Sequence, residues 1–497
     1  MNIIPAPVKV EIISDNRTPI SSIGFGNNLL SDEAKKDFLD FCKLSEGETN
    51  IFFENDASLD EEEYALKTEK GEVKITASSA SGQLYALQTL KQILFENGFS
   101  LPDVEIYDKP THKIRGFMLD VGRYFYTVEE VKTFIRRMAM HKLNLFHFHL
   151  TEDQGWRIQI DAFPLLTEIG SKRTNTNFDR VPREGYYTKA DIKEIVDYAH
   201  AFCIKVMPEF DIPGHSRAAI ACYKELTCFE RDLPVATHWG VKHDVLCVGK
   251  ESTFDFVYKV IDEMCEMFPD EYFHIGGDEV PKHRWDLCPH CQAKRKELGL
   301  SNSDALQFWF MNKVKDYCKA KGKQAFMWSW ELESDKDIDS DLGFTLCDGD
   351  SDIGDRPYID TSTKAYYIDL PYGYINLKDT ADSKTKNRNC LGLEVTLWTE
   401  YVKDMKKADY MTYPRLGAFC ENAWNGGIGY EAFSKKLDYY YSLLDYNKIG
   451  YAKPHQAMPN KIRKPISVLW FERRQLAWEG LHNIFDDKAI EKMAKSK

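Results

Sequence analysis

Long hydrophobic runs are missing from this sequence of 497 residues. No apolar stretch approaches the roughly 18 to 20 residues that a helix needs to cross a bilayer, and we therefore expect no membrane span. The opening residues, MNIIPAPVKVEIISD, lack the basic and apolar regions of a signal peptide. Both a cytoplasmic protein and a periplasmic or secreted one whose leader has been removed fit this pattern.

Blocks of positive charge are also absent. The 78 Asp and Glu residues outnumber the 65 Lys and Arg residues, and the formal net charge is −13. A nucleic-acid partner would require basic side chains that neutralise phosphates, so the charge argues against one. A neutral or cationic small substrate is compatible with it. The sequence gives no indication of the oligomeric state.

Closely spaced cysteines are rare. Most of the twelve cysteines stand alone in apolar stretches, where a thiol acts as a small hydrophobe, and we expect them to be reduced. The exception is Cys288-Pro-His-Cys291, with His283 and His290 close by. This spacing is that of half a zinc site, but no second cysteine pair completes it. We therefore predict a structural turn here, with no metal site and no cofactor.

The pattern of the chain changes near residue 112. Before this point, a β-rich opening leads to SASGQLYALQTLKQILFEN, whose apolar residues recur at helical spacing, namely Leu84, Leu87, Leu90 and Ile93. The segment LPDVEIYDKPTHK then has the proline content of a boundary. We predict a small α+β domain over residues 1–112.

From residue 115 onward, short apolar runs alternate with amphipathic stretches. The runs are GFMLDV, LNLFHFHL, KVMPEF, EYFHIGG, QAFMWSW, GFTLC, KAYYIDL and LGLEVTLW. Between the first two, Thr127 and Glu130 have the spacing of a helix capping box. Eight buried strands alternating with helices predict a parallel (β/α)₈ TIM barrel over residues 113–430. The competing architecture is an open doubly wound sheet, which no glycine-rich nucleotide turn supports.

The last part, residues 431–497, is predicted to be a helical extension packed on the barrel. The segment ISVLWFERRQLAWEGLHNIF has the pattern of an amphipathic helix. Its apolar residues are expected to contact the barrel rather than a partner protein, and they include Leu469, Phe471, Leu476 and Leu481.

Polar and aromatic residues gather where the apolar runs end. Active sites of such barrels lie at the carboxyl ends of the strands, so residues from seven runs are expected to face one mouth. In chain order these residues are Asp120, Arg123, His149, Glu152, Asp153, Glu209, Asp211, His215, Asp278, Glu279, Trp328, Trp330, Glu331, Tyr367, Asp369, Trp398 and Glu400.

Carboxylates combined with tryptophans and an arginine indicate a carbohydrate site. Tryptophan faces stack on the apolar face of a pyranose, while Asp, Glu and Arg bind its hydroxyls. A glycosidase also needs a carboxylic acid at the leaving oxygen.

The adjacent Asp278 and Glu279 cannot flank a sugar from opposite sides. When the substrate carries a 2-acetamido group, however, its own amide carbonyl can attack the anomeric carbon. One carboxylate then orients the amide and the other acts as acid and base. We expect the repulsion between the two carboxylates to raise the pKa of one of them and so keep an acid protonated.

The sequence resembles family 20 of the glycoside hydrolases, the β-N-acetylhexosaminidases. The resemblance rests on SGQLYALQTLKQIL, RGFMLDVGRYF, KLNLFHFHLTEDQGWRI, MPEFDIPGHS, HIGGDEV, LWTEYV and YPRLGAFCENAW, which occur in this order over about residues 80–425. It implies an exo-acting enzyme that removes terminal β-linked N-acetylglucosamine or N-acetylgalactosamine from a glycan or oligosaccharide. It also implies retention of configuration and a substrate-assisted route through an oxazolinium intermediate.

The resemblance assigns the catalytic roles by position. It implies that Asp278 orients the acetamido group and that Glu279 is the general acid and base. Asp211 and His215, in DIPGH, match a pair that lies beside the acid and tunes it.

Five further residues match positions that hold the sugar. Arg123 matches the ligand of the 3- and 4-hydroxyls, and Glu400 matches that of the 4- and 6-hydroxyls. Trp398 matches the tryptophan beneath the ring. Tyr367 matches the donor to the acetamido carbonyl, with Asp369 as its neighbour in the same pattern.

The sequence departs from the family pattern at three places. Glu152-Asp153 stands where two aspartates are common. The segment MWSWEL offers two tryptophans, of which we favour Trp328 over Trp330 for the acetamido pocket. The sixth run, GFTLCDGD, lacks a tryptophan that often completes this pocket.

Three alternative functions stay open. Two of them, a lacto-N-biosidase-like enzyme and an enzyme that prefers sulfated N-acetylglucosamine, lie within the same family. The third is an inactive carbohydrate-binding barrel. Glu279 argues against the third alternative, because a lectin has no use for an acid beside a charged aspartate.

Overall fold

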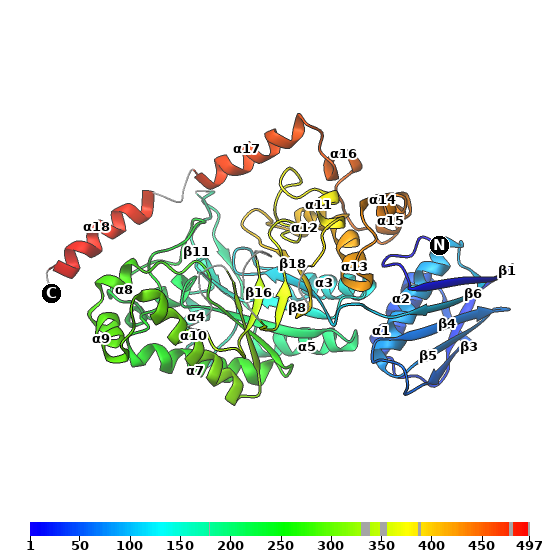
Figure 1. Cartoon of the computed structure of the whole chain (residues 1–497), viewed down its shortest axis with the longest axis horizontal. Helices are drawn as coiled ribbons and strands as arrows, with labels where there is room; N and C mark the ends of the chain where they lie inside the picture. Colours follow the sequence, from blue (N-terminus) through cyan, green and yellow to red (C-terminus); the bar gives the residue numbers. More distant parts are fainter. Residues whose placement is uncertain (178, 330–337, 348–354, 386–388, 477–480, 496–497) are drawn as a thin grey trace.

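The computed structural model describes the chain except for residues 178, 330–337, 348–354, 386–388, 477–480 and 496–497. The N-terminal domain, a sheet with helices packed on it, lies at one end of the molecule. The barrel lies in the middle, and α18 lies at the other end (Figure 1). Among the described residues, each helix is too short or too polar to cross a membrane.

The N-terminal domain has the predicted α+β fold. Its six-stranded sheet has the order β1-β6-β4-β5-β3-β2. One helix, α2, covers the sheet with its leucine-rich face, and Leu84, Leu87, Leu90 and Ile93 are all buried. The elements are β1 (Lys9–Pro19), β2 (Ser22–Phe25), α1 (Asp32–Cys42), β3 (Ser45–Asn55), β4 (Tyr64–Glu69), β5 (Glu72–Ala77), α2 (Ala80–Glu96) and β6 (Ser100–Asp108).

The predicted barrel is confirmed. Eight parallel strands close in the order β13-β14-β15-β16-β17-β18-β7-β8. Their residues are almost all buried, because side chains fill the barrel on one face and helices cover the other. The strands are β7 (Ile114–Asp120), β8 (Leu145–His149), β13 (Lys205–Ile212), β14 (Tyr272–Gly276), β15 (Gln324–Trp328), β16 (Gly343–Leu346), β17 (Tyr358–Asp360) and β18 (Cys390–Leu397).

The seventh strand was predicted at the wrong place. The tripeptide Tyr-Ile-Asp occurs twice, at residues 358–360 and 367–369, and the longer apolar run KAYYIDL favours the second copy. The structure instead uses the first copy as β17. The second copy lies in the following loop, where Tyr367 makes a single bridge to Thr396 of β18. Tyr367 and Asp369 are therefore presented by a loop that lies against the barrel.

The first helix of the barrel begins as predicted. Thr127 caps α3, its side chain accepts from the amide of Glu130, and the Glu130 side chain accepts from the Thr127 amide. The larger barrel helices are α3 (Val128–Met140), α5 (Lys189–Ala201), α7 (Glu251–Met267), α9 (Pro289–Leu298), α10 (Ser303–Ala320), α12 (Met405–Thr412) and α13 (Arg415–Asn425). Between them lie the shorter elements β9 (Thr151–Glu152), β10 (Gly155–Trp156), α4 (Leu165–Glu168), β11 (Lys172–Arg173), β12 (Arg183–Glu184), α6 (Arg217–Cys222), η1 (Lys224–Leu226), α8 (His283–Leu287) and α11 (Leu377–Ala381).

The C-terminal region is helical and contacts the barrel through several of its helices. The ring of Phe471 lies 5.4 Å from that of Tyr401. Further along, Asp487 forms an ion pair of 2.7 Å with Arg284. Leu469, by contrast, is 67% exposed, and the side chains of Leu476 and Leu481 lie outside the described set. The helices are α14 (Tyr430–Ser434), α15 (Leu437–Tyr446), α16 (Pro454–Ala457), α17 (Arg463–Leu476) and α18 (Leu481–Lys495).

Candidate active site

Most of the predicted site residues line one cavity at the carboxyl ends of the barrel strands. Its volume is about 340 Å³, which is within the range of small-ligand sites. The predicted residues along its wall are Arg123, Asp153, His215, Asp278, Glu279, Tyr367, Asp369, Trp398 and Glu400.

Two glycines position the acidic pair after β14. Gly276 and Gly277 have φ angles of 65° and 99°, in the region that favours glycine. A Cβ atom on Gly276 would lie 1.8 Å from Oδ1 of Asp211, so no side chain fits there. The sharp turn leaves the side chain of Asp278 only 8% exposed, whereas the side chain of Glu279 is 49% exposed.

The two neighbouring carboxyls consequently have different pKa values. Burial raises the pKa of Asp278 to about 7, Glu279 and Glu209 add to the effect, and His215 opposes it. Burial also acts to raise the pKa of Glu279, but His215 outweighs it and the pKa lies below its usual value. We expected one member of the pair to be raised so that the acid stays protonated, and the raised member is Asp278 rather than Glu279.

His215 lies between the acidic pair and Glu152. Its Nε2 atom is 3.5 Å from Oε2 of Glu279 and 3.9 Å from Oδ2 of Asp278. On the other side, Nδ1 is 3.2 Å from Oε2 of Glu152. Burial alone would lower the pKa of His215, but the charges of Glu152 and Asp211 raise it well above the usual value. His215 is thus a cation that faces carboxylates on both sides.

Arg123, in the wall of the same cavity, is held by three carboxylates. Its Nη2 atom lies 2.6 Å from Glu152 and 3.7 Å from Glu400, and Nη1 lies 3.3 Å from Asp120. Its guanidinium is 5.0 Å from the centre of the Trp398 ring. Burial acts to lower the pKa of Arg123, but the carboxylates raise it well above the usual value. The planar guanidinium of Arg123 is therefore held in one orientation before a ligand binds.

Aromatic rings form the apolar part of the cavity. Trp398 and Tyr367 both line it, with ring centres 6.4 Å apart. The Tyr367 hydroxyl donates to the sulfur of Cys347 at 3.4 Å. A planar tryptophan face beside an arginine fork is suited to the apolar face and the hydroxyls of one sugar ring.

Trp328, which we expected in the wall of the acetamido pocket, lies behind the residues that line the cavity. It is fully buried, its indole N–H donates to Oε1 of Glu209 at 2.6 Å, and its ring lies 5.4 Å from that of Trp398. Trp328 is the last residue of β15, and its ring packs against those of His147 and His274 from neighbouring barrel strands as well as that of Trp398. The competing candidate, Trp330, lies outside the described residues, as does Glu331.

Glu152 and Asp211 also lie behind the cavity wall. Each is only 1% exposed. Glu152 joins Arg123 to His215, so the charge kept by the longer side chain links two cations of the site. Both carboxyl oxygens of Asp211 lack a hydrogen-bond partner, and burial together with Asp278 raises the pKa of Asp211 well above its usual value.

Several residues of the wall were not among the predicted ones. Tyr401 directly follows Glu400, so its place after a strand end was visible in the sequence. Trp239 lies in the loop between η1 and α7, and Phe471 comes from α17, where we predicted only packing. The complete set of additional wall residues is Gln154, Trp239, Gly240, Val241, Thr363, Leu370, Tyr401 and Phe471.

Comparison with known families agrees with this geometry. Residues 112–356 and 355–427 match the catalytic domain of glycosyl hydrolase family 20, and residues 1–109 match domain 2 of that family. The chain belongs to glycosyl hydrolase family 20. The resemblance inferred from its motifs is thereby confirmed.

A curated relative is similar over most of the chain. A beta-hexosaminidase of Porphyromonas gingivalis is 38% identical over 437 residues, covering 81% of this chain and 56% of the relative. The chain thus spans little more than half the length of that relative.

Solved family 20 structures share the fold. A β-N-acetylhexosaminidase from Bacteroides fragilis has a TM-score of 0.80 at 29% identity, covering 92% of this chain and 99% of the other. An exo-β-N-acetylglucosaminidase from Vibrio harveyi, solved with N-acetylglucosamine, has a TM-score of 0.81 at 26% identity, covering 91% of this chain and 78% of the other.

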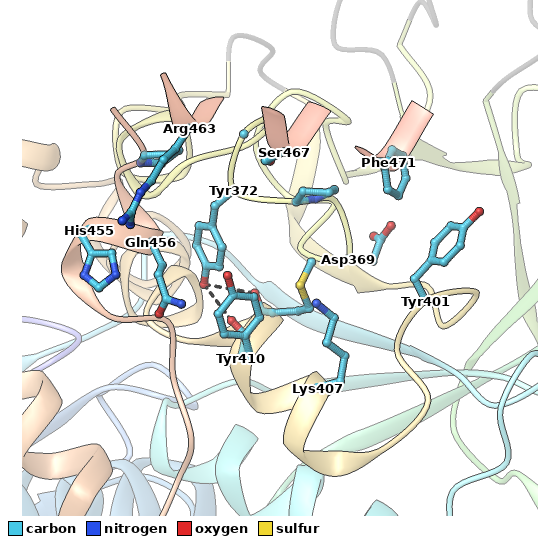
Figure 2. A pocket seen from close by; sticks show the side chains of 14 residues that line it. Asp369, Tyr372, Tyr401, Lys407, Tyr410, His455, Gln456, Arg463, Ser467 and Phe471 are labelled. Carbon is cyan, nitrogen blue, oxygen red and sulfur yellow. Dashed lines mark hydrogen bonds between the residues drawn. The ribbon is translucent and has the colours of Figure 1, made fainter. Parts of the chain in front are cut away.

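A second cavity adjoins the first in this family 20 barrel. It has a volume of about 290 Å³ and shares Asp369, Tyr401 and Phe471 with the candidate active site. Figure 2 shows Asp369 beside the rings of Tyr401 and Phe471, and the wall also includes Tyr372, Tyr410 and residues of α16 and α17. The acidic pair and Arg123 belong to the first cavity, so we place the chemistry there and regard the second as its extension.

Proposed function

We propose that the protein is an exo-acting, retaining β-N-acetylhexosaminidase, with its catalytic barrel over residues 113–430 flanked by residues 1–112 and 431–497. It removes a terminal β-linked N-acetylglucosamine or N-acetylgalactosamine from a glycan. The observation that carries the proposal is the Asp278–Glu279 pair at the end of β14, with one carboxyl buried and one half-exposed in a cavity that also holds Arg123 and Trp398.

The buried member of the pair suits the acetamido group. Asp278 receives the amide N–H of the substrate, which leaves the amide carbonyl free to attack the anomeric carbon. As the oxazolinium forms, positive charge develops on the amide nitrogen, and the carboxylate of Asp278 stabilises it. Tyr367 donates its hydroxyl hydrogen to the acetamido oxygen and holds it in line.

The half-exposed member suits the leaving group. Glu279 faces the cavity with 49% of its side chain accessible, so an arriving aglycone covers it and raises its pKa. It then protonates the leaving oxygen and afterwards removes a proton from the attacking water. This assignment needs one proton to pass from Asp278 to Glu279 when substrate binds, and His215 lies within 4 Å of both carboxyls.

The far side of the cavity suits the remaining hydroxyls. Arg123 binds those at positions 3 and 4, and Glu400 and Asp369 bind those at positions 4 and 6, while Trp398 stacks beneath the ring. Five wall residues are acidic, whereas Arg123 and His215 supply positive charge. This balance favours an oxocarbenium-like transition state and disfavours the sulfated sugar considered as an alternative.

Inhibition by the bicyclic thiazoline that mimics the cyclised acetamido intermediate tests the proposal. With an aryl β-N-acetylglucosaminide as substrate, we expect hydrolysis and tight competitive inhibition. Hydrolysis that is insensitive to the thiazoline would indicate a protein nucleophile or an inverting water. Absence of hydrolysis would favour the alternative of an inactive carbohydrate-binding barrel.

The second cavity favours one alternative, a lacto-N-biosidase-like activity that releases a disaccharide. Room for another sugar exists beside Asp369, where Tyr401 and Phe471 offer aromatic faces. The aryl β-glycosides of N-acetylglucosamine and of lacto-N-biose separate the two activities. Faster cleavage of the disaccharide glycoside would favour the alternative, and cleavage of the monosaccharide glycoside alone would exclude it.

A further inference from the structure

Four buried cysteines meet outside the active site, in the segments that follow β13 and β14. The Sγ atoms of Cys228, Cys247, Cys288 and Cys291 all lie within 4.8 Å of one another. The separations are 3.6 Å for Cys247–Cys291, 3.7 Å for Cys247–Cys288 and 3.8 Å for Cys228–Cys291. None of the four residues is more than 5% exposed.

These separations match a tetrahedral metal site. Zn²⁺ binds four thiolates at about 2.3 Å, which places the sulfurs roughly 3.8 Å apart. Disulfide pairing does not explain the arrangement, because Cys247 is nearly equidistant from Cys288 and Cys291. Hydrophobic packing does not explain it either, because it gives no reason for four sulfurs to converge from three parts of the chain.

The backbone is shaped to bring the first two cysteines together. Thr227 and Leu246 form an antiparallel bridge, so the residues that follow them, Cys228 and Cys247, come from two adjacent passes of the chain. The amide of Cys247 donates to the carbonyl of Leu226 at 2.7 Å. These contacts hold the two sulfurs on one side of the bridged segment.

The second two cysteines lie at the start of a helix. Cys288 is the N-cap of α9 and Cys291 is in its first turn, where backbone amides favour a negative charge on sulfur. Gly249 allows this turn to approach, since a Cβ atom there would lie 2.4 Å from the carbonyl carbon of His290 and 2.5 Å from the amide of Cys291. The glycine therefore permits contact between the two halves of the cluster.

We propose that Cys228, Cys247, Cys288 and Cys291 bind one Zn²⁺ as four thiolates. Binding releases the thiol protons to solvent, and the metal makes no redox change. Four protein ligands leave no open position, so the ion is structural. The proposal departs from the sequence prediction of a structural turn without metal at Cys288–Cys291. That prediction rested on the absence of a second closely spaced pair, whereas Cys228 and Cys247 stand singly in the chain and spacing alone does not reveal them.

The ion joins two segments that carry the candidate active site. The first segment leads from His215 past Trp239 to Cys247, and the second leads from Asp278 and Glu279 to Cys288. Near the cluster, the Trp285 indole of the second segment donates to the Leu246 carbonyl of the first at 2.9 Å. The Leu246 amide in turn donates to the carbonyl of Pro213, two residues before His215, at 2.9 Å. We infer that zinc fixes the position of the His215 segment relative to the acidic pair, whichever glycan the enzyme cleaves.

The first test is the metal content of the full chain, purified without a metal-affinity tag and without chelators. Elemental mass spectrometry should find one zinc per chain, and titration of the native protein with an organomercurial should release that zinc as four thiols react. Absence of zinc, stoichiometric iron in its place, or disulfides found after alkylation without reductant would each overturn the assignment.

Variants separate the cluster from the other buried cysteines. Cys228→Ser and Cys291→Ser should retain less than about a tenth of the zinc, because loss of one thiolate opens the site. Cys318→Ser is the matched control, since Cys318 is equally buried but lies on α10 away from the cluster. Equal zinc in all three variants would overturn the assignment. If the first two fail to fold, wild-type protein produced with cobalt must show the intense absorption of a tetrahedral cobalt thiolate, and a weak octahedral spectrum would overturn it.

Hydrogen exchange tests the link to the active site. After removal of zinc, peptides covering residues 213–250 and 277–298 should exchange faster, whereas those of the N-terminal sheet should not change. Unchanged exchange in both active-site segments would contradict the positioning role of the ion.

Discussion

The Nε2 atom of His215 lies 3.5 Å from Oε2 of Glu279. This contact lowers the pKa of the residue that we propose as the acid, while burial raises the pKa of its neighbour Asp278 to about 7. In the free protein the proton of the pair therefore resides on Asp278. Binding of an N-acetylated sugar reverses this preference, because the amide N–H stabilises ionised Asp278 and the aglycone covers Glu279.

This distribution predicts the direction of the pH dependence. The productive form of the pair holds one proton, and in the free enzyme that proton is lost as the pH rises through the pKa of Asp278. We therefore expect kcat/KM to fall with an apparent pKa of about 7 on the alkaline side. In Asp278→Asn, which is also much slower, the fall should begin at a lower pH, because Glu279 then titrates alone. An alkaline limb that stays in place in this variant would contradict the assignment.

Replacement of His215 should shift the alkaline fall of kcat/KM to higher pH, opposite to the shift expected for Asp278→Asn. His215 lowers the pKa of both carboxyls, so His215→Gln should shift the alkaline limb of kcat/KM upward by about one pH unit. His200→Gln, on the exposed face of α5, provides the control and should leave the profile unchanged. An identical profile in the two variants would show that His215 does not tune the pair.

Loss of the acid should depend on the leaving group. Glu279→Gln should reduce kcat by about 10²- to 10⁴-fold on a natural glycan but far less on an activated aryl glycoside, whose leaving group hardly needs a proton. Steady-state rates on the two substrates measure the difference. Equal losses on both would remove Glu279 from the role of acid.

The aromatic wall contributed by α17 gives a test with an internal control. Phe471 lines both cavities and contacts Tyr401, whereas Leu469, on the same helix, is 67% exposed. Phe471→Ala should raise KM for an oligosaccharide about tenfold, or roughly 1.4 kcal/mol. Leu469→Ala should leave it unchanged, and similar values for both variants would mean that α17 does not contact substrate.

The buried tryptophan should act on stability more than on binding. Trp328→Phe keeps an aromatic ring but removes the donor to Glu209, which leaves a buried carboxylate oxygen without that partner. We expect a loss of about 1 to 3 kcal/mol in the free energy of unfolding, measured with denaturant, and a KM close to that of the wild type. A large rise in KM without loss of stability would instead place Trp328 in contact with the sugar.

Local patterns in the sequence predicted much of the fold and the acidic pair. Alternating apolar runs indicated the barrel, Thr127 and Glu130 indicated the start of α3, and HIGGDEV indicated two carboxylates at the end of a strand. The seventh strand was missed because β17 has only three residues, too few for a hydrophobic pattern to distinguish the two Tyr-Ile-Asp copies.

The remaining features depend on contacts between distant parts of the chain. Phe471 lines the cavity but belongs to a helix that follows the barrel in the chain. Trp328 lies behind the cavity wall, where its indole N–H donates to Glu209 of another strand. Cys228 and Cys247 join Cys288 and Cys291 only after two loops fold against each other. The spacing of residues in the sequence does not show that they lie close together in the folded protein.

The position of Phe471 has a consequence for biosynthesis. One wall of the cavity belongs to α17, which the ribosome makes after all eight strands of the barrel. A nascent chain that has already closed its barrel therefore still has an open cavity on that side, and it acquires the complete wall only when the later helix emerges and docks.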